Sequence, residues 1–359
     1  MEDYRILAIN PGSTSTKIAV YAGASPVFVK NISHTTDELA HFDKITDQYS
    51  YRKEIIYKEL QEAEIMLDLI RAVVGRGGLL KPIPSGVYVV NDQMKADLRN
   101  SPMGEHASNL GGLIADDIAR SLPDAKAYIA DPVVVDELQD IARIAGHPDF
   151  KRISIFHALN QKAVARTHAK SIMKNYEDLN LIVVHLGGGI TVGAHEKGKV
   201  IDVNQGLDGE GPFSPERSGT LPSADLIRAC FSGKYSEKQL LKMVKGEGGM
   251  VAHLGTNSAY EVEQRVEAGD EKAYLIFDAM AYQVAKYIGA MATVLYGHVD
   301  GILITGGIAK SAWFVNRIMA RVHRIAPVYV YPGEDEMRAL AMNGLMVLRG
   351  EIEPKVYGN

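Results

Sequence analysis

A short turn near the N-terminus, residues 10–17, gathers side chains that are well suited to chemistry. It carries an amide at Asn10, hydroxyls at Ser13 and Ser15, and an ammonium group at Lys17, around one glycine. A turn of this kind presents backbone N–H groups and side-chain donors to an anion, most often a phosphate. An ordinary solvated hairpin tip has a similar composition, so the turn taken alone fits both interpretations equally well.

Two further glycine turns follow apolar segments that are typical of strands. The second turn consists of Gly187, Gly188 and Gly189, and the third contains Gly306 and Gly307. Glycine brings backbone N–H groups close to a phosphate because no Cβ atom intervenes. Three such turns suggest a nucleotide held at several points. The first turn is not a P-loop, since it lacks the glycine directly before the lysine, and the second is not a dinucleotide fingerprint, since a strand follows it.

The first two turns belong to a repeat within the sequence. An offset of 175 residues carries Gly12 onto Gly187 and Gly23 onto Gly198, with one threonine also aligned between them. In both copies two apolar runs flank the turn and a third run follows, which is typical of a three-stranded meander. Three aligned landmarks within similar hairpins favour a duplicated domain.

Strands alternate with helices through both halves of the chain, which predicts α/β domains with mixed sheets. We expect helices over residues 56–74 and 104–121 in the first half, and over 271–296 and 334–349 in the second. The first of these should end at the glycine pair that follows Arg76, since glycine is a common C-cap. Small residues in the last helix suggest close packing where the two halves meet.

Composition excludes several classes of protein. The net charge of −5 does not favour binding to nucleic acid or to acidic membranes. No apolar run approaches the roughly 18 residues of a membrane helix, and the acidic N-terminus leads straight into a strand, unlike a signal peptide. A single cysteine, Cys230, excludes an intramolecular disulfide and fits a reducing compartment. We therefore expect a cytoplasmic protein that binds neither nucleic acid nor membranes.

Three motifs, at residues 10–17, 185–189 and 305–308, together resemble those of the acetate kinase family. That family belongs to the superfamily of sugar kinases, actin and heat-shock chaperone ATPases. The opening motif and the short chain look most like its butyrate kinase branch. The resemblance implies two duplicated actin-like (ribonuclease H-like) domains with mixed sheets and a cleft between them. It also implies that the γ-phosphoryl group of ATP is transferred reversibly, by direct in-line attack, to a short-chain carboxylic acid.

The length of 359 residues likewise predicts two domains. We place the N-terminal domain at residues 1–178, with the first phosphate turn and part of the acyl site. The C-terminal domain at residues 179–359 would hold the second phosphate turn and the adenosine site, and its last helix would cross back to the first domain. By resemblance, the chain would assemble as a homodimer or a larger homo-oligomer.

Transfer of a phosphoryl group to a carboxylate makes few demands on proton transfer. The carboxylate is already ionised near neutral pH, so it needs no catalytic base. Instead, an anion must approach a polyanion while negative charge spreads over the phosphoryl oxygens. Arginine, lysine, histidine and a divalent cation such as Mg²⁺ are the groups that stabilise such charge.

The resemblance assigns catalytic roles to five residues. Arg76, before a glycine pair, and Arg217, in an Arg-Ser-Gly segment, would bind the carboxylate or the transferring phosphoryl group. His157, after an aromatic residue, would hydrogen bond to that phosphoryl group, and Asn10 would lie near it. Asp131 would orient water around Mg²⁺ or position Arg217. Each residue but Asn10 also has a structural explanation: a helix C-terminal arginine, a solvated loop arginine, a buried histidine and an Asp-Pro turn.

The remaining assignments concern ATP and Mg²⁺. His185 would contact a nucleotide phosphate, together with the hydroxyls and lysine of the first turn and the glycines of the other two. Gly188 stands where the family often has asparagine, so contact there would come from the backbone. Mg²⁺ would be held by Asn10 and Glu336, through water, with Glu334 as the alternative carboxylate.

Two other functions remain open at this stage. A sugar or polyol kinase of the same superfamily would need a carboxylate to deprotonate a hydroxyl, for which Asp202 and Asp208 are candidates. An actin-like ATPase that forms filaments would use the same phosphate turns. The carboxylate kinase is the interpretation that the motifs favour.

Overall fold

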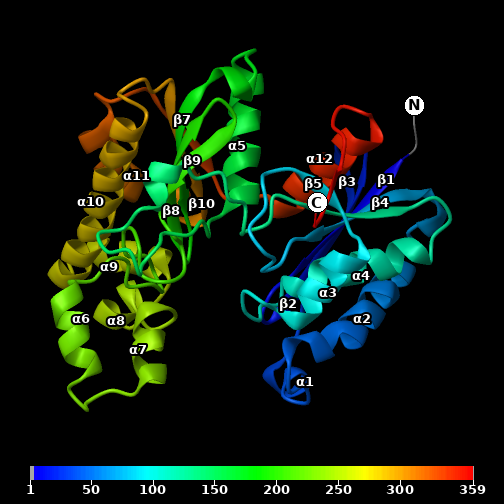
Figure 1. Cartoon of the computed structure of the whole chain (residues 1–359), viewed down its shortest axis with the longest axis horizontal. Helices are drawn as coiled ribbons and strands as arrows, with labels where there is room; N and C mark the ends of the chain where they lie inside the picture. Colours follow the sequence, from blue (N-terminus) through cyan, green and yellow to red (C-terminus); the bar gives the residue numbers. More distant parts are fainter. Residues whose placement is uncertain (1–3, 359) are drawn as a thin grey trace. The chain divides into compact units, whose positions relative to one another are not determined.

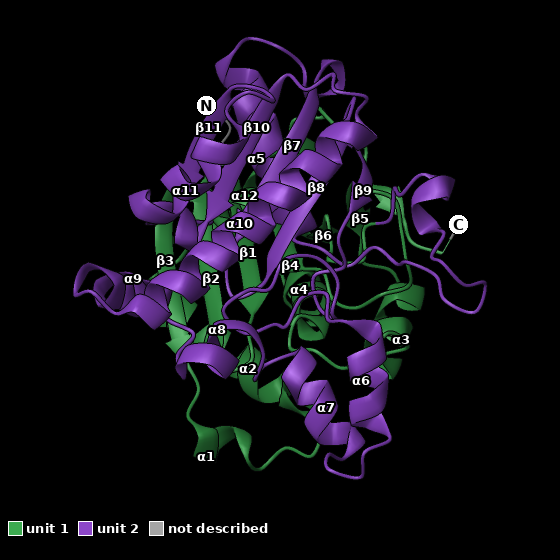
Figure 2. Cartoon of the chain, turned by 90° about the vertical axis from the view of Figure 1, so that its left-hand side faces the viewer, with its two compact units in different colours: residues 1–135, 335–359 green, residues 136–334 purple. Residues whose placement is uncertain are grey.

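The computed structural model describes residues 4–358. The chain forms two compact units, residues 1–135 with 335–359 and residues 136–334, which Figure 2 shows in separate colours. Each unit contains one β-sheet with helices on both faces (Figure 1). The predicted class of two α/β domains with mixed sheets is confirmed. The boundary predicted after residue 178 differs from this division, which assigns residues 136–178 to the second unit.

The first unit has a seven-stranded sheet in the order β12-β5-β6-β4-β1-β2-β3. Strands β1, β2 and β3 form an antiparallel meander, whereas β4 pairs in parallel with both β1 and β6. Helix α12 covers one face, and α4 covers the other with α2 and α3 beside it (Figure 1). The elements are β1 (Arg5–Pro11), β2 (Ser15–Ala22), β3 (Ser25–Ser33), α1 (Thr36–Leu39), α2 (Tyr49–Glu62), β4 (Ile70–Arg76), β5 (Val87–Val89), α3 (Asp92–Asn100), α4 (Asn109–Arg120), β6 (Lys126–Ala130), α12 (Glu336–Leu348) and β12 (Lys355–Val356).

The second unit has a five-stranded sheet in the order β11-β10-β7-β8-β9, between α5 on one face and α10 with α11 on the other (Figure 1). Its elements are α5 (Ala158–Ser171), β7 (Asn180–Leu186), β8 (Ile190–Glu196), β9 (Lys199–Val203), α6 (Ser223–Cys230), α7 (Glu237–Val244), α8 (Gly249–Leu254), α9 (Ala259–Glu267), α10 (Glu271–Val294), β10 (Gly301–Gly306), α11 (Ala312–Val322) and β11 (Val328–Pro332). Among the described helices, none combines the length and the apolar character needed to cross a membrane.

Strand β7 shows why the central strands are continuous apolar runs. Leu181 and Val183 pack in the cluster that includes α5, whereas Ile182 and Val184 pack in the cluster built on α10. A strand covered on both faces does not alternate between apolar and polar residues. The same pattern explains the apolar sequence of β10, which is buried throughout.

Residues 70–76 correct the helix predicted over 56–74. Helix α2 ends at Glu62, and the chain then enters β4, whose central residues 72–74 are fully buried. A continuous apolar run satisfies helical spacing as well as strand spacing, so periodicity alone could not separate the two. Arg76 therefore ends a strand rather than a helix, and its interpretation as a helix C-terminal arginine is wrong.

Helix α12 packs directly on the first sheet. A Cβ atom added to Gly344 would lie 2.8 Å from Val74 Cγ2 and 3.1 Å from Ile6 Cγ2, so only glycine allows this approach. The small-residue face of α12 therefore packs on β1 and β4, so a helix from the end of the chain covers the sheet formed by its first part. This packing fixes the start of α12 relative to the ends of those strands.

The two sheets repeat one motif. The order β4-β1-β2-β3 in the first sheet recurs as β10-β7-β8-β9 in the second, with the same strand directions. A register shift follows Val20 in β2 and also follows Ala194 in β8, 174 residues later. The offset of 175 falls by one after the first strand because the second turn is one residue shorter. Thr16 therefore corresponds to Ile190 and not to Thr191, and Gly23 corresponds to Lys197 and not to Gly198.

Candidate active site

The first cluster of polar side chains lies in the first unit, where β1, β4 and α12 meet. Asn10 is near the end of β1, Arg76 ends β4, and Glu336 begins α12. Asn10 Nδ2 donates to Glu336 Oε2 at 2.5 Å, and Arg76 Nη1 donates to Asn10 Oδ1 at 3.2 Å. Arg76 also forms an ion pair with Glu336, with Nη2 and Oε1 3.2 Å apart. Three residues distant in sequence thus form one group, called here the Asn10 cluster, at the carboxyl ends of parallel strands.

Two residues of the first turn extend the Asn10 cluster along β2. Lys17 is the direct partner of Asn10 in the antiparallel register, so the two side chains leave the same face of the sheet. Ser15 precedes Lys17 by two residues and shares that face, whereas Thr16 is buried on the other face. Ser13 is exposed in the turn itself. The structure therefore places the predicted turn residues beside the cluster.

Sequence reasoning missed Arg52, which lies in α2 behind the first turn. Its guanidinium donates to carbonyl oxygens of the turn, including that of Gly12 at 2.8 Å, and its side chain is 0% exposed. A signal was available, because Arg52 stands four residues before the buried Ile56 and so lies in the apolar stripe of α2. An arginine in that stripe needs buried partners, which the turn supplies.

Asp131, directly after β6, is 1% exposed and holds a turn of its own. Its Oδ1 atom accepts hydrogen bonds from the Ser85 hydroxyl at 2.6 Å and from the Gly86 N–H at 2.9 Å. Its φ angle of 37° lies in a region that few non-glycine residues adopt. These bonds connect the ends of β5 and β6. The role predicted for Asp131 beside Mg²⁺ or Arg217 stays a prediction.

The second cluster lies in the second unit and is built on two histidines. His157 directly precedes α5 and His185 lies in β7, and their rings stack with centroids 3.9 Å apart. His157 Nδ1 is 2.9 Å from the Thr191 hydroxyl, and His185 Nδ1 is 2.8 Å from Asn160 Oδ1. Glu334 Oε2 lies 3.5 Å from His185 Nε2. The two predicted histidines are therefore brought together, here called the histidine pair.

A buried chain of hydrogen bonds supports the histidine pair from within the unit. Gln161 Nε2 donates to the Thr191 hydroxyl at 2.8 Å, and Gln161 Oε1 is 2.9 Å from His195 Nε2. His195 Nδ1 is in turn 2.7 Å from the Tyr176 hydroxyl. Complete burial lowers the pKa of His195 well below its usual value, with smaller contributions from nearby cations. His195 is therefore neutral in the folded protein.

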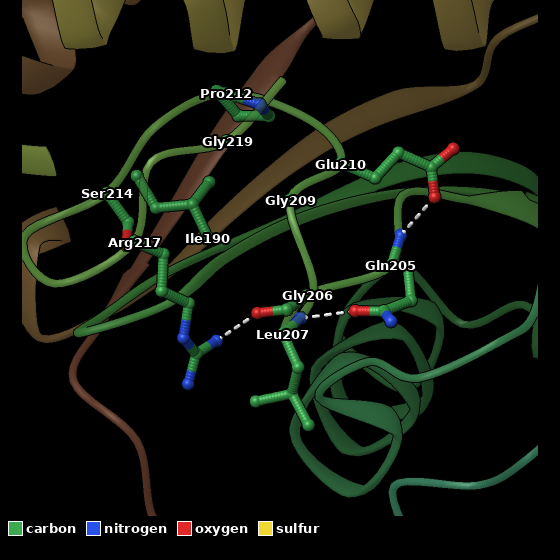
Figure 3. A pocket seen from close by; sticks show the side chains of 10 residues that line it. All are labelled: Ile190, Gln205, Gly206, Leu207, Gly209, Glu210, Pro212, Ser214, Arg217 and Gly219. Carbon is green, nitrogen blue, oxygen red and sulfur yellow. Dashed lines mark hydrogen bonds between the residues drawn. The ribbon is translucent and has the colours of Figure 1, made fainter. Parts of the chain in front are cut away.

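Arg217 lies in a loop beside the second glycine turn. Its guanidinium donates to the carbonyl oxygen of Gly206, and a Cβ atom on Gly189 would overlap with it. Burial lowers the pKa of Arg217, while Glu216 acts in the opposite direction. A guanidinium nevertheless stays charged in a protein. Figure 3 shows Arg217 at the edge of a pocket that is also lined by Ile190, Gln205, Gly206, Leu207, Gly209, Glu210, Pro212, Ser214 and Gly219.

The other predicted glycines lie at strand ends. The second turn joins β7 to β8, and Gly188 is exposed at its tip. Gly306 ends β10 and is bonded to Gly333 through N–H to O contacts of 3.0 and 2.8 Å in the two directions. A Cβ atom on Gly307 would meet open space. The structure thus confirms the strand-end positions, while phosphate contact at these turns stays a prediction.

Comparison with known proteins decides the family. The model of the acetokinase family matches residues 151–340. A probable butyrate kinase of Bacteroides thetaiotaomicron is 54% identical over 353 residues, with 98% of this chain and 99% of that protein covered. A probable butyrate kinase of Phocaeicola vulgatus is 56% identical with the same coverage. The chain belongs to the acetokinase family. As a member of this family, it is an ATP-dependent carboxylate kinase.

Solved structures share the fold of this acetokinase-family chain. The acetate kinase of Porphyromonas gingivalis has a TM-score of 0.79 at 17% identity, with 96% of this chain and 100% of that chain covered. The acetate kinase of Entamoeba histolytica has a TM-score of 0.76 at 16% identity, with the same coverage. Both likenesses concern the fold.

Membership of the acetokinase family disfavours the sugar kinase alternative, and the structure gives a reason. Asp202 is paired with Arg152, with Oδ1 and Nη1 3.0 Å apart. Asp208 accepts a hydrogen bond from Gln205 Nε2 at 2.7 Å. Burial raises the pKa of Asp202, and Arg152 opposes that rise. Asp202 is therefore held in an ion pair within its own unit.

The choice between the two carboxylates predicted for Mg²⁺ can be examined directly. Glu336 joins Asn10, whereas Glu334 lies beside His185 in the other unit. Residues 4–358 contain no group of three or more His, Cys, Asp or Glu side chains that could hold a metal ion. One carboxylate and one amide nevertheless suit Mg²⁺, which prefers oxygen ligands and keeps several waters. The Asn10 cluster therefore fits the predicted magnesium ligands.

Proposed function

We propose that this chain transfers the γ-phosphoryl group of ATP to butyrate or a branched short-chain analogue, giving an acyl phosphate and ADP. The observation that carries the proposal is the guanidinium of Arg217, which lies against Gly189 of the second glycine turn. Ile190, Leu207 and Pro212 contribute apolar side chains to the small depression beside it (Figure 3). A guanidinium binds a carboxylate or a phosphoryl group in bidentate fashion, so it suits both reactants.

The names of the close relatives support a four-carbon substrate. Both relatives at 54% and 56% identity are described as probable butyrate kinases. Arg217 would orient the carboxylate for in-line attack, and Arg76 would stabilise charge on the transferring group. No side chain has to remove a proton from the substrate, since the nucleophile is already an anion.

His157 is held through Nδ1, which lies 2.9 Å from the Thr191 hydroxyl, and that hydroxyl also accepts a hydrogen bond from Gln161 Nε2. The other ring nitrogen, Nε2, would donate to a phosphoryl oxygen as charge develops there.

The residues proposed to bind the nucleotide are found in each of the two units. In the first unit, the turn containing Ser13, Ser15 and Lys17 would bind phosphate. In the second, His185 and the glycine turns would bind phosphate, and the adenosine site would lie in that unit. Mg²⁺, held by Asn10 and Glu336, would neutralise phosphate charge when bound.

Two further properties belong to this proposal. The chain would act in the cytoplasm, consistent with its one free and exposed cysteine, Cys230. It would act as a homodimer or larger homo-oligomer, for which exposed apolar side chains such as Leu275 and Phe231 are suitable contacts. Light scattering during size-exclusion chromatography measures the mass of the assembly and so the number of subunits.

The test is an acyl phosphate assay with trapping by hydroxylamine. Acyl phosphates react to hydroxamates, whereas sugar phosphates do not. Acids of increasing length and branching are compared by kcat/KM, from acetate to valerate with isobutyrate included. We expect hydroxamate to form with ATP and to be greatest for a four- or five-carbon acid. Absence of hydroxamate with every acid would refute the proposed function.

A further inference from the structure

Arg52 lies fully buried behind the first turn and holds it from one side. Its Nη1 group donates to the carbonyl oxygens of Gly12 at 2.8 Å and of Ser15 at 2.9 Å. Nη1 also donates to the Thr16 hydroxyl at 2.9 Å, and Nη2 donates to the Ser13 carbonyl oxygen at 3.2 Å. One guanidinium therefore gathers three carbonyl oxygens of the turn.

These bonds decide where the amide groups of the turn point. A trans peptide is planar, so its N–H points away from its C=O. Because Arg52 holds the carbonyl groups of Gly12 and Ser13, the N–H groups of Ser13 and Thr14 point to the opposite side, where both residues are exposed. Within residues 4–358, neither of these N–H groups meets an acceptor. Two adjacent N–H groups on an exposed turn form a site for an anion.

The charge of Arg52 has no acidic partner in the described part of the chain. Beyond the turn, its Nε and Nη2 groups donate to Gln48 Oε1 at 3.1 and 2.8 Å. Burial lowers the pKa of Arg52, yet its guanidinium stays charged. All of its hydrogen-bond partners are neutral. A buried charge among neutral groups is costly, so an anion on the other side of the turn would offset that cost.

We propose that Arg52 is a positioning residue for a nucleotide phosphate: it directs the N–H groups of Ser13 and Thr14 toward the phosphate, which serves as its counter-ion. The inference rests on the proposed function, in which the first turn binds phosphate. Arg52 acts through the peptide groups and does not touch the phosphate. If Arg52 only shaped the turn, its charge would not affect ATP binding. Neutralising the charge while keeping the hydrogen bonds separates the two roles.

Gln48→Glu makes that change within the native geometry. Glutamate has the shape of glutamine, and its carboxylate accepts the same hydrogen bonds from Arg52 while supplying a negative charge. The matched control is Gln61→Glu, which adds the same charge at an exposed position on α2. For the full chain with Mg²⁺, one measures KM for ATP, kcat, and the unfolding midpoint with and without ATP.

We expect Gln48→Glu to raise KM for ATP roughly tenfold, as for one added charge near a phosphate. The unfolding midpoint without ATP should rise, because the buried cation gains a partner, and the increase on adding ATP should shrink. Gln61→Glu should leave all three values unchanged. An unchanged KM, or a lower midpoint without ATP, would overturn the proposal. Wild-type protein that forms no hydroxamate would instead overturn the proposed function, so the two failures are distinguishable.

Discussion

The imidazole of His157 stacks on that of His185, with ring centroids 3.9 Å apart and planes inclined by 16°. Each ring is also fixed through Nδ1, in one case by Thr191 and in the other by Asn160. Stacking and hydrogen bonding together hold both rings in defined planes. The ring of His157 is therefore held with little rotational freedom, which suits a preorganised donor.

Replacing His157 by alanine should lower kcat about 10²-fold, the usual effect of losing one donor to the transition state. KM for ATP should change little, because the lost bond forms chiefly as charge develops on the phosphoryl group. The hydroxamate assay at saturating acid measures both. A conservative change, His157→Gln, retains a donor and should recover part of the loss. An unchanged kcat in His157→Ala would contradict the role of donor.

Arg217→Ala should have a larger effect, lowering turnover about 10³-fold or more, since a charged group next to the substrate is lost. ATP should still raise the unfolding midpoint, because the nucleotide is bound by other residues. Arg228→Ala is a matched control, since Arg228 is an exposed arginine paired with Asp225 on α6. Near-normal turnover of Arg217→Ala would refute its assigned role.

The sequence predicted the meanders well because their signals are local. Short apolar runs and turn glycines located β1 to β3 and β7 to β9 without knowledge of the fold. The strand at residues 70–76 was missed for the opposite reason, since burial on both faces depends on α4 and α12 packing there. The unit boundary also differs because residues 136–178 belong with the second sheet, which is a property of tertiary packing.

The residues of the site were predicted from sequence motifs. The tertiary contacts show which of these residues, distant in sequence, come together. Glu334 and Glu336 are two residues apart and were alternatives for one role, yet the boundary between the units falls between them. Glu336 contacts Asn10 across 326 positions of sequence, which no local pattern reveals. Arg52 lies 40 positions from Gly12 and carries no motif at all.

Gly189→Ala tests the packing of Arg217 without changing a charge. The added methyl group would overlap with the guanidinium, so Arg217 would have to move away from Gly206. We expect kcat/KM for the acid to fall by roughly 10²-fold, in the same direction as Arg217→Ala. Gly289→Ala is the control, because a Cβ atom there, in α10, meets nothing within 4 Å. Full activity of Gly189→Ala would show that the position of Arg217 is not critical.

Glu336→Gln should raise the Mg²⁺ concentration that gives half-maximal activity, roughly tenfold, because one negative oxygen ligand becomes a neutral amide. Glu334→Gln should leave this Mg²⁺ dependence unchanged, since Glu334 lies beside His185 and not beside Asn10. Titrating Mg²⁺ at constant ATP compares the two variants. If Glu334→Gln changes the Mg²⁺ dependence and Glu336→Gln does not, the magnesium site belongs to Glu334.

Buried histidines predict that the folded state loses stability in acid. The pKa of His195 is lowered in the folded protein by burial, and those of His34 and His168 are lowered for the same reason. Below about pH 6.5 these groups bind protons in the unfolded state that the folded state does not accept, so unfolding becomes easier as pH falls. Above that pH the histidines are neutral in both states, so this acid destabilisation is absent.

His195→Gln isolates the contribution of the histidine that is completely buried. Glutamine can keep a hydrogen bond to Gln161 or to Tyr176, but it does not titrate. We expect the unfolding midpoint of the wild type to fall between about pH 7 and pH 5, and that of His195→Gln to fall less steeply. Its absolute midpoint will be lower at neutral pH, because the two bonds of the imidazole are not both replaced. Equal slopes would mean that His195 is protonated in the folded protein. The chain of hydrogen bonds from Tyr176 through His195 and Gln161 to Thr191 would then not contain a neutral imidazole.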